Sequence, residues 1–174
     1  MNSVQKTIFL VAGEPSGDIH GARLVSAMKK GQSNILFVGH GGDEMASAGV
    51  TIIEHVDNLS IMGFSEVIQN LYRMFHILDE TVETIKHTMP DRVILIDYPG
   101  FNLRLAKRIR ELDIPITYFI LPQAWAWGEK RVKTMKPLLN QALSIFPFEK
   151  EWFEIRGLPI NYVGHPFADR QSVK

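Results

Sequence analysis

The residue best placed for chemistry in this sequence is Asp97, which directly follows the apolar run 92–96. A carboxylate at the tip of a buried strand loses hydration, which raises its pKa and can aim it at a cleft. Such a group suits a general base that accepts a proton from an attacking hydroxyl. The alternative is an aspartate that caps the following turn or helix.

A second group of candidates occupies the loop Gly-Glu-Pro-Ser-Gly-Asp at 13–18, after the apolar run 7–12. Glycines permit positive φ and close approach of a ligand, and the amino end of a following helix attracts anions. We expect Ser16 or Asp18 to cap that helix. The loop lacks the sequence of a Walker loop and the glycine spacing of a dinucleotide fingerprint. A tight strand-to-helix turn without a ligand is the alternative.

Two tryptophans, Trp125 and Trp127, follow the apolar run 116–120. In an extended segment both rings would face one side, where they could stack on a sugar or cover an acyl chain. Packing beneath a loop is the alternative. His40 lacks a spaced partner for a metal site, so it fits a loop filler at least as well as a functional group, and Glu149 fits a first-turn helix acid.

These candidates follow apolar runs that alternate with segments of helical period, a pattern typical of parallel strands covered by crossover helices. We predict strands at 7–12, 35–38, 92–96, 116–120, 142–145 and 161–163. We predict helices at 19–29, 42–48, 64–88, 103–112, 130–139 and 149–155. Right-handed crossovers would place the helices on both faces of a doubly wound, mostly parallel Rossmann-like α/β sheet. Ligands of such sheets bind beyond the carboxyl ends of the strands.

The helix predicted at 64–88 is amphipathic, with apolar residues at three- and four-residue spacing. Packing against the sheet explains most such stripes. Tyr72 and Arg73, beside a face rich in methionine and phenylalanine, would also suit the headgroup boundary of a membrane. The stripe consists of Phe64, Val67, Ile68, Leu71, Met74, Phe75 and Leu78.

Composition indicates one folded domain, since 45% of the 174 residues are hydrophobic and 22% are charged. Basic and acidic residues balance at 19 each, so no global field would gather nucleic acid.

The lack of cysteine fits a reducing compartment, with the cytoplasm as the default. No run approaches the roughly 18 apolar residues that span a bilayer, so any membrane contact would be peripheral. The polar stretch after 166 resembles the start of a connection, so we expect a truncated chain.

Taken together, the motifs form an ordered series that resembles the lipid-A-disaccharide synthase family of GT-B glycosyltransferases. The likeness covers nearly the whole chain, and it rests on order and spacing. Family members have a second Rossmann-like domain that holds the UDP part of the sugar donor. The resemblance therefore implies that residues 1–174 are the amino-terminal, acceptor-side half, without the carboxyl-terminal UDP-sugar-binding domain. The motifs are GEPSGD, VGHGG, IMGFSEVI, IDYPGFN, PQAWAW, the pair Arg131-Val132, PFEK and VGHP.

By this resemblance, the full protein joins UDP-diacylglucosamine to lipid X, an acylated glucosamine phosphate, with inversion and without a metal or other cofactor. Asp97 matches the family aspartate proposed as the base. The segment 65–75 matches the helix thought to meet the cytoplasmic face of the inner membrane. Substrate contacts are implied for Gly13, Glu14, Ser16, Gly17, Asp18, Gln123, Trp125 and Trp127. Membrane or acyl-chain contacts are implied for Phe64, Val67, Ile68, Leu71, Met74 and Phe75.

Two positions depart from the family pattern, namely Leu121, where relatives often have serine or cysteine, and Gly100, where many have aspartate. Alone, the chain is expected to be inactive, because stabilising the leaving UDP would fall to the missing domain. A noncatalytic lipid-binding or assembly module is the main alternative. Another GT-B enzyme or a sugar-nucleotide epimerase is a further one. A face meant for an absent domain would also favour a homo-oligomer.

Overall fold

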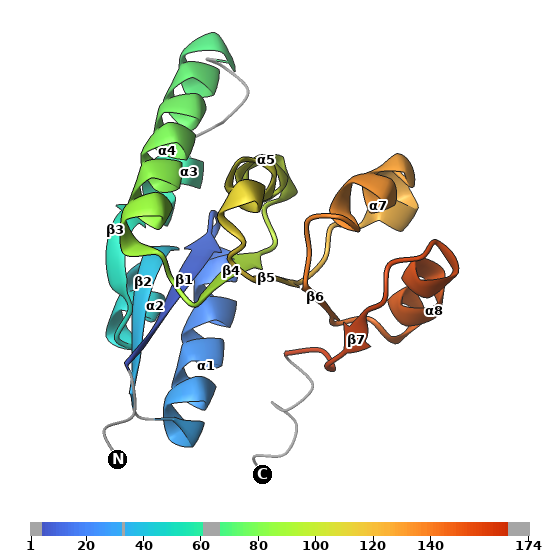
Figure 1. Ribbon diagram of the computed structural model, residues 1–174, viewed down its shortest axis with the longest axis horizontal. Helices are drawn as coiled ribbons and strands as arrows, with labels where there is room; N and C mark the ends of the chain where they lie inside the picture. Colours follow the sequence, from blue (N-terminus) through green and yellow to red (C-terminus); the bar gives the residue numbers. More distant parts are fainter. Residues whose placement is uncertain (1–4, 33, 61–66, 167–174) are drawn as a thin grey trace.

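The computed structural model describes residues 5–32, 34–60 and 67–166, and the side chains of 60, 67–70 and 127 are outside that description. A seven-stranded parallel sheet forms the centre of the described chain (Figure 1). Its strand order, β3-β2-β1-β4-β5-β6-β7, reverses direction between β1 and β4, which confirms the doubly wound prediction. The strands are β1 (Lys6–Ala12), β2 (Ile35–Gly41), β3 (Thr51–His55), β4 (Arg92–Ile96), β5 (Ile116–Phe119), β6 (Gln141–Ser144) and β7 (Asn161–Tyr162).

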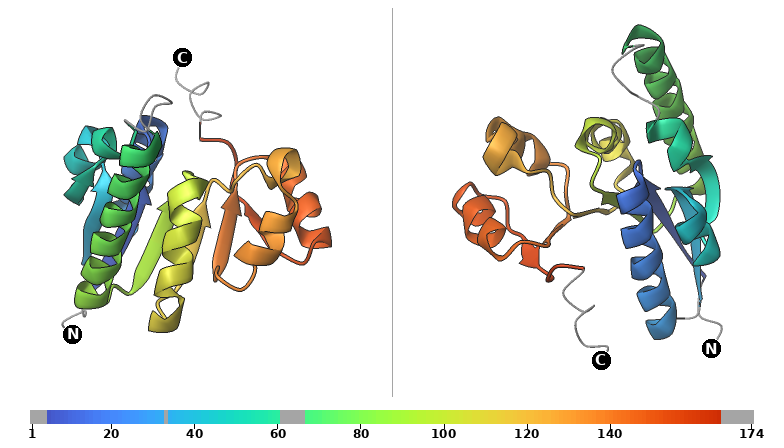
Figure 2. Two further views of the ribbon diagram at one scale, coloured as in Figure 1. Left: turned by 90° about the horizontal axis from the view of Figure 1, so that it is seen from above. Right: turned by 180° about the vertical axis from the view of Figure 1, so that it is seen from behind.

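Helices cover both faces of the sheet, as two further views show (Figure 2). Neighbouring residues of β1 point to opposite faces, so that Phe9 packs in one hydrophobic cluster and Leu10 in the other. The first cluster lies under α4, α5, α7 and α8, and the second under α1 and α2. The helices are α1 (Pro15–Gly31), α2 (Asp43–Ser47), α3 (Val56–Ser60), α4 (Val67–Thr88), α5 (Pro99–Ile109), α6 (Ala124–Trp127), α7 (Lys130–Met135) and α8 (Pro147–Ile155), with a 3-10 turn at Arg110–Leu112.

Proline marks the true starts of three helices. The helices predicted at 19–29 and 103–112 begin four residues earlier, at Pro15 and Pro99, and α8 begins at Pro147. Proline suits the first turn because its missing N–H would have no partner there. The apolar periodicity that guides the prediction starts only after this first turn.

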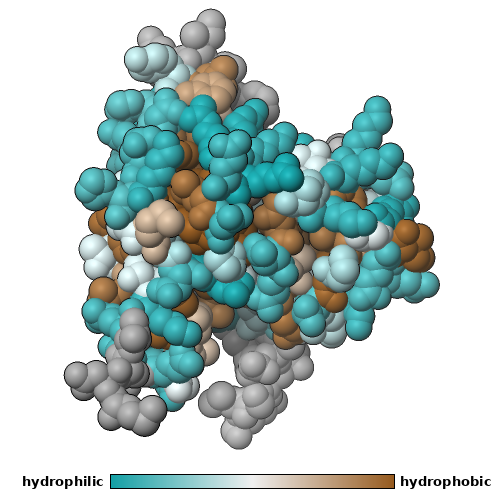
Figure 3. All heavy atoms as spheres, in the orientation of Figure 1, coloured by the Kyte–Doolittle hydropathy of each residue, from teal (hydrophilic) through white to brown (hydrophobic). Residues whose placement is uncertain are grey.

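The apolar stripe of α4 is partly buried in the core and partly exposed to solvent. Met74 and Leu78 are buried in the core, whereas Leu71 and Phe75 are 47% and 37% exposed. Phe64 lies outside the described residues, and so do the side chains of 67 and 68. Hydrophilic side chains dominate the face seen in Figure 3, with hydrophobic ones visible between them. Core packing therefore explains only part of the stripe.

None of the described helices combines the length and the apolar character needed to cross a membrane.

Candidate active site at the carboxyl ends of the strands

The loop at 13–18 and Asp97 meet where the strand order reverses. Strands β1 and β4 pair in parallel, and their last partners are Ala12 and Ile96. Gly13 and Asp97 therefore leave the sheet side by side at the topological switch point, where open α/β sheets bind their ligands. The structure thus brings two of the sequence candidates together through backbone pairing alone.

Asp97 is held in an unusual backbone conformation. Its φ is +46°, and that of Tyr98 is +47°, a left-handed region that costs residues other than glycine about 1–3 kcal/mol. Two buried side chains hold the Asp97 carbonyl oxygen in place. The Tyr118 hydroxyl and the Asn102 amide each donate a hydrogen bond to it, both at 2.7 Å. The carboxyl group of Asp97 therefore projects from a backbone that is fixed on two sides.

Burial and charge also tune Asp97. Desolvation, and then the negative charge of Glu14, raise the pKa of this half-buried carboxyl, while the N–H of Tyr98 opposes the rise. A higher pKa makes the carboxylate a stronger base, which suits a group that accepts a proton from a hydroxyl. Burial, and then Asp97, raise the pKa of Tyr118 well above its ordinary value, so the phenol stays a hydrogen-bond donor.

Position 13 has room only for glycine because the Tyr98 ring packs against it. A Cβ atom at Gly13 would lie 2.2 Å from Cδ1 of the Tyr98 ring. That ring stacks on Phe101, with centroids 6.1 Å apart, and its hydroxyl donates to the Leu59 carbonyl at 3.3 Å. The glycine therefore has a packing reason, and its contact with a substrate stays a prediction.

Asp18 caps a helix other than its own. Its carboxylate accepts the backbone N–H groups of Gly42, Glu44 and Met45 at 2.7, 3.1 and 3.0 Å, at the start of α2. The prediction that Ser16 or Asp18 caps α1 is wrong, since α1 has no side-chain cap bond. Gly17 and Asp18 are buried, whereas Glu14 and Ser16 are exposed.

A cavity of about 240 Å³ opens beside Asp97, across the carboxyl ends of β4, β5 and β6. Ile120 lies at its wall with a φ of +62°, a further strained position for a β-branched residue. The cavity contains carboxyl, amide and guanidinium groups. Its lining is Asp97, Pro99, Ile120, Leu121, Pro122, Gln123, Arg131, Ile145, Phe146 and Glu149.

Glu149 belongs to a buried network that the sequence did not reveal. One carboxylate oxygen accepts a hydrogen bond from the Trp125 indole at 3.1 Å, and the other accepts one from the Ser144 hydroxyl. Glu149 does lie in the first turn of α8, but it also lines the cavity and accepts the hydrogen bond of the Trp125 indole.

The two tryptophans do not lie in an extended segment. Residues 124–127 form the short helix α6, so the expectation that extended spacing turns both rings to one side is wrong. Trp125 is 41% exposed and meets Phe148 edge to face, with centroids 5.3 Å apart. The Trp127 side chain is outside the described part of the chain, and Gln123 precedes α6 as an exposed cavity residue.

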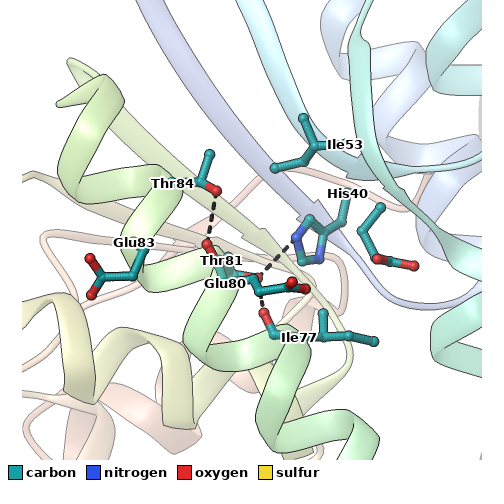
Figure 4. Close-up of a pocket in the computed structure, with 8 residues that line it drawn as sticks. His40, Ile53, Ile77, Glu80, Thr81, Glu83 and Thr84 are labelled. Carbon is teal, nitrogen blue, oxygen red and sulfur yellow. Dashed lines mark hydrogen bonds between the residues drawn. The ribbon is translucent and has the colours of Figure 1, made fainter.

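His40 lies in a second cavity, of about 420 Å³, against α4 (Figure 4). It belongs to β2 and is fully buried, so the loop-filler interpretation is wrong. Its Nε2 lies 3.1 Å from the Thr81 hydroxyl, which itself donates to the Ile77 carbonyl, so Nε2 carries the proton. Burial lowers the pKa of His40 to about 4. Among the residues that the structure describes, no cluster of His, Asp and Glu could hold a metal ion.

Comparison with known proteins gives a family match over most of the chain. The model of the family described as Lipid-A-disaccharide synthetase matches residues 8–174. The Lipid-A-disaccharide synthases of Myxococcus xanthus and Syntrophus aciditrophicus are 39% and 40% identical over 163 and 169 residues. These matches cover 94% and 97% of this chain but 43% and 44% of the relatives. The chain thus spans less than half the length of these relatives.

Solved structures support the fold. S. aureus MnaA, in a co-structure with UDP, has a TM-score of 0.68 at 13% identity, covering 96% of this chain and 47% of that one. The UDP-GlcNAc 2-epimerase of Neisseria meningitidis has a TM-score of 0.61 at 12% identity, covering 92% and 47%. At such identities the likeness shows the fold alone, a Rossmann-like α/β unit of the GT-B type.

Proposed function

Because this chain belongs to the lipid-A-disaccharide synthetase family, we propose that it forms the acceptor-binding half of a GT-B glycosyltransferase in lipid A synthesis. The reaction would transfer diacylglucosamine from UDP to a hydroxyl of lipid X, giving the lipid A disaccharide phosphate and UDP. The observation that carries this proposal is the Asp97 carboxyl, with its raised pKa, at the switch point of the sheet.

Asp97 would act as the general base of the transfer. As the acceptor oxygen attacks the anomeric carbon, the bond from that carbon to the UDP oxygen breaks, and UDP leaves with the bonding electrons. The hydroxyl proton passes to the Asp97 carboxylate, which lowers the barrier only if the carboxylate is correctly aimed. The bonds from Tyr118 and Asn102 to the Asp97 carbonyl supply that aim.

The groups that hold UDP would come from a second domain outside residues 1–174. The chain spans less than half of its relatives, and stabilising the leaving group is a large part of such a reaction. We therefore expect no turnover by this chain alone. The exposed Leu71, Tyr72 and Phe75 of α4 would place it peripherally on the cytoplasmic face of the inner membrane.

The partial coverage of the relatives also keeps a noncatalytic lipid-binding module as the second candidate function. An epimerase role has less support, because the UDP-GlcNAc 2-epimerase structures share only the fold, at 12% identity.

The test is a turnover assay of this chain, with and without the carboxyl-terminal half of the M. xanthus relative. We expect disaccharide only in the mixture, and a loss of about 10²- to 10⁴-fold for Asp97→Asn, the usual contribution of a general base. Asp113→Asn is the matched control, since Asp113 is exposed at a helix end with a φ that asparagine adopts readily. Full activity of the Asp97 variant would refute the base assignment. Lipid binding without turnover in any mixture would favour the noncatalytic module.

A further inference from the structure

Two opposite charges line the cavity beside Asp97 without neutralising each other. Arg131, near the start of α7, and Asp97, at the end of β4, both contribute to the wall. Between the residues that the structure describes, no ion pair within 4.0 Å involves either side chain. A guanidinium that faces a cavity containing carboxyl groups, yet pairs with none of them, is suited to an anion that arrives with a ligand.

The other acidic group of the cavity is already satisfied. Both oxygens of the buried Glu149 carboxylate accept hydrogen bonds, from Trp125 and from Ser144. Among the residues that the structure describes, Glu149 forms no ion pair within 4.0 Å, so it does not neutralise Arg131. Arg131 is the one cationic side chain in the described lining of this cavity.

The position of Arg131 is supported by its neighbours. Its side chain lies along the backbone of Gly128, where a built Cβ would be 3.4–3.5 Å from Cγ, Cδ and Nε. The pKa of Tyr118 is raised mainly by burial and by Asp97, and the charge of Arg131 opposes this rise. The field of the guanidinium thus reaches the hydroxyl that holds Asp97.

We propose that Arg131 binds the phosphate monoester of the acceptor and so places the acceptor hydroxyl against Asp97. This inference rests on the proposed function and adds a recognition residue to it. Arginine suits the task because its planar fork donates two parallel hydrogen bonds to phosphate oxygens. The cavity of about 240 Å³ is smaller than the roughly 300–1,000 Å³ of drug-sized pockets, so it takes the phosphorylated sugar and leaves the acyl chains outside.

The experiment uses calorimetry to measure how tightly two probes, presented in detergent micelles, bind to this chain. The probes are diacylglucosamine 1-phosphate and the same lipid without phosphate. We expect the phosphorylated probe to bind about 10- to 100-fold more tightly, the range for hydrogen bonds to a charged group. Arg131→Gln should abolish this preference, and Arg131→Lys should keep part of it because lysine retains the charge but not the fork.

Lys133→Gln is the matched control, because Lys133 is an exposed residue of α7 that does not line the cavity. It should keep the preference for phosphate. If folded Arg131→Gln, checked by circular dichroism, keeps the preference too, the assignment of Arg131 is overturned while acceptor binding stands. If the unmodified chain binds both probes equally, the phosphate subsite is again overturned. If it binds neither, the proposed acceptor-binding function fails, and this inference fails with it.

Discussion

Replacing His40 by glutamine should remove a pH dependence of stability that the buried imidazole gives to the fold. The His40 ring is enclosed by Phe9, Phe101 and Thr81, and burial lowers its pKa to about 4. In the unfolded chain a histidine titrates near pKa 6.5. The difference between the two pKa values corresponds to about 3 kcal/mol of unfolding free energy.

The sign follows from which state binds the proton. Below about pH 6.5 the unfolded chain takes up a proton at His40 that the folded chain does not, so the free energy of unfolding falls as the pH falls. The loss continues until the folded imidazole titrates near pH 4. Above about pH 7 this histidine contributes no pH dependence.

The assay is urea unfolding of both proteins at pH 7 and pH 4.5. Glutamine can still donate to Thr81 but carries no titrating group, so His40→Gln should lose about 2 to 3 kcal/mol less stability than the unmodified chain over this interval. Other titrating groups cancel in the comparison, and His87→Gln, at an exposed position of α4, serves as the control. Equal losses in the unmodified chain and the His40 variant would refute the assignment of a buried neutral imidazole.

Two further predictions concern the site and the membrane surface. Tyr118→Phe removes the hydroxyl that holds the Asp97 carbonyl, so the turnover number of the reconstituted enzyme should fall more than its KM changes. The loss of this hydrogen bond should also lower the free energy of unfolding by about 1 kcal/mol. An unchanged turnover number would contradict this positioning role. Replacing the exposed Leu71 and Phe75 by serine should reduce binding to liposomes while the melting temperature stays near normal, whereas Leu78→Ala in the core should lower the free energy of unfolding by about 2–5 kcal/mol. Liposome flotation measures the membrane binding and urea unfolding measures the stability. Unfolding of the serine variant would place Leu71 and Phe75 in the core.

Most of the sheet can be predicted from the sequence, because six of its seven strands coincide with compact apolar or β-branched runs. Strand β3 (Thr51–His55) is missed, although residues 50–53 are four consecutive β-branched residues that favour a strand. It is the edge strand, and its residues are exposed or half-buried, so it forms no continuous buried run in the fold. Short α3, which follows directly, escapes prediction with it.

The position of Asp97 at the end of a strand could be predicted, but the side chains that hold its carbonyl group could not. Tyr118 comes from β5 and Asn102 from α5, and only the folded sheet brings both side chains to one carbonyl. The capping role of Asp18 had a faint signal, because α2 begins after Gly42, which has no side chain to cap it. A helix start without its own cap requires a partner from elsewhere in the chain.

The distribution of backbone strain supports a functional interpretation of this edge of the sheet. Among the described residues other than glycine, five have positive φ, and Met89 and Asp113 follow helices, where a left-handed residue is usual. Asp97, Tyr98 and Ile120 instead directly follow strands β4 and β5. Because such strain persists only where the surroundings fix it, the buried donors beneath Asp97 are best understood as keeping a costly conformation for the sake of where its carboxyl points.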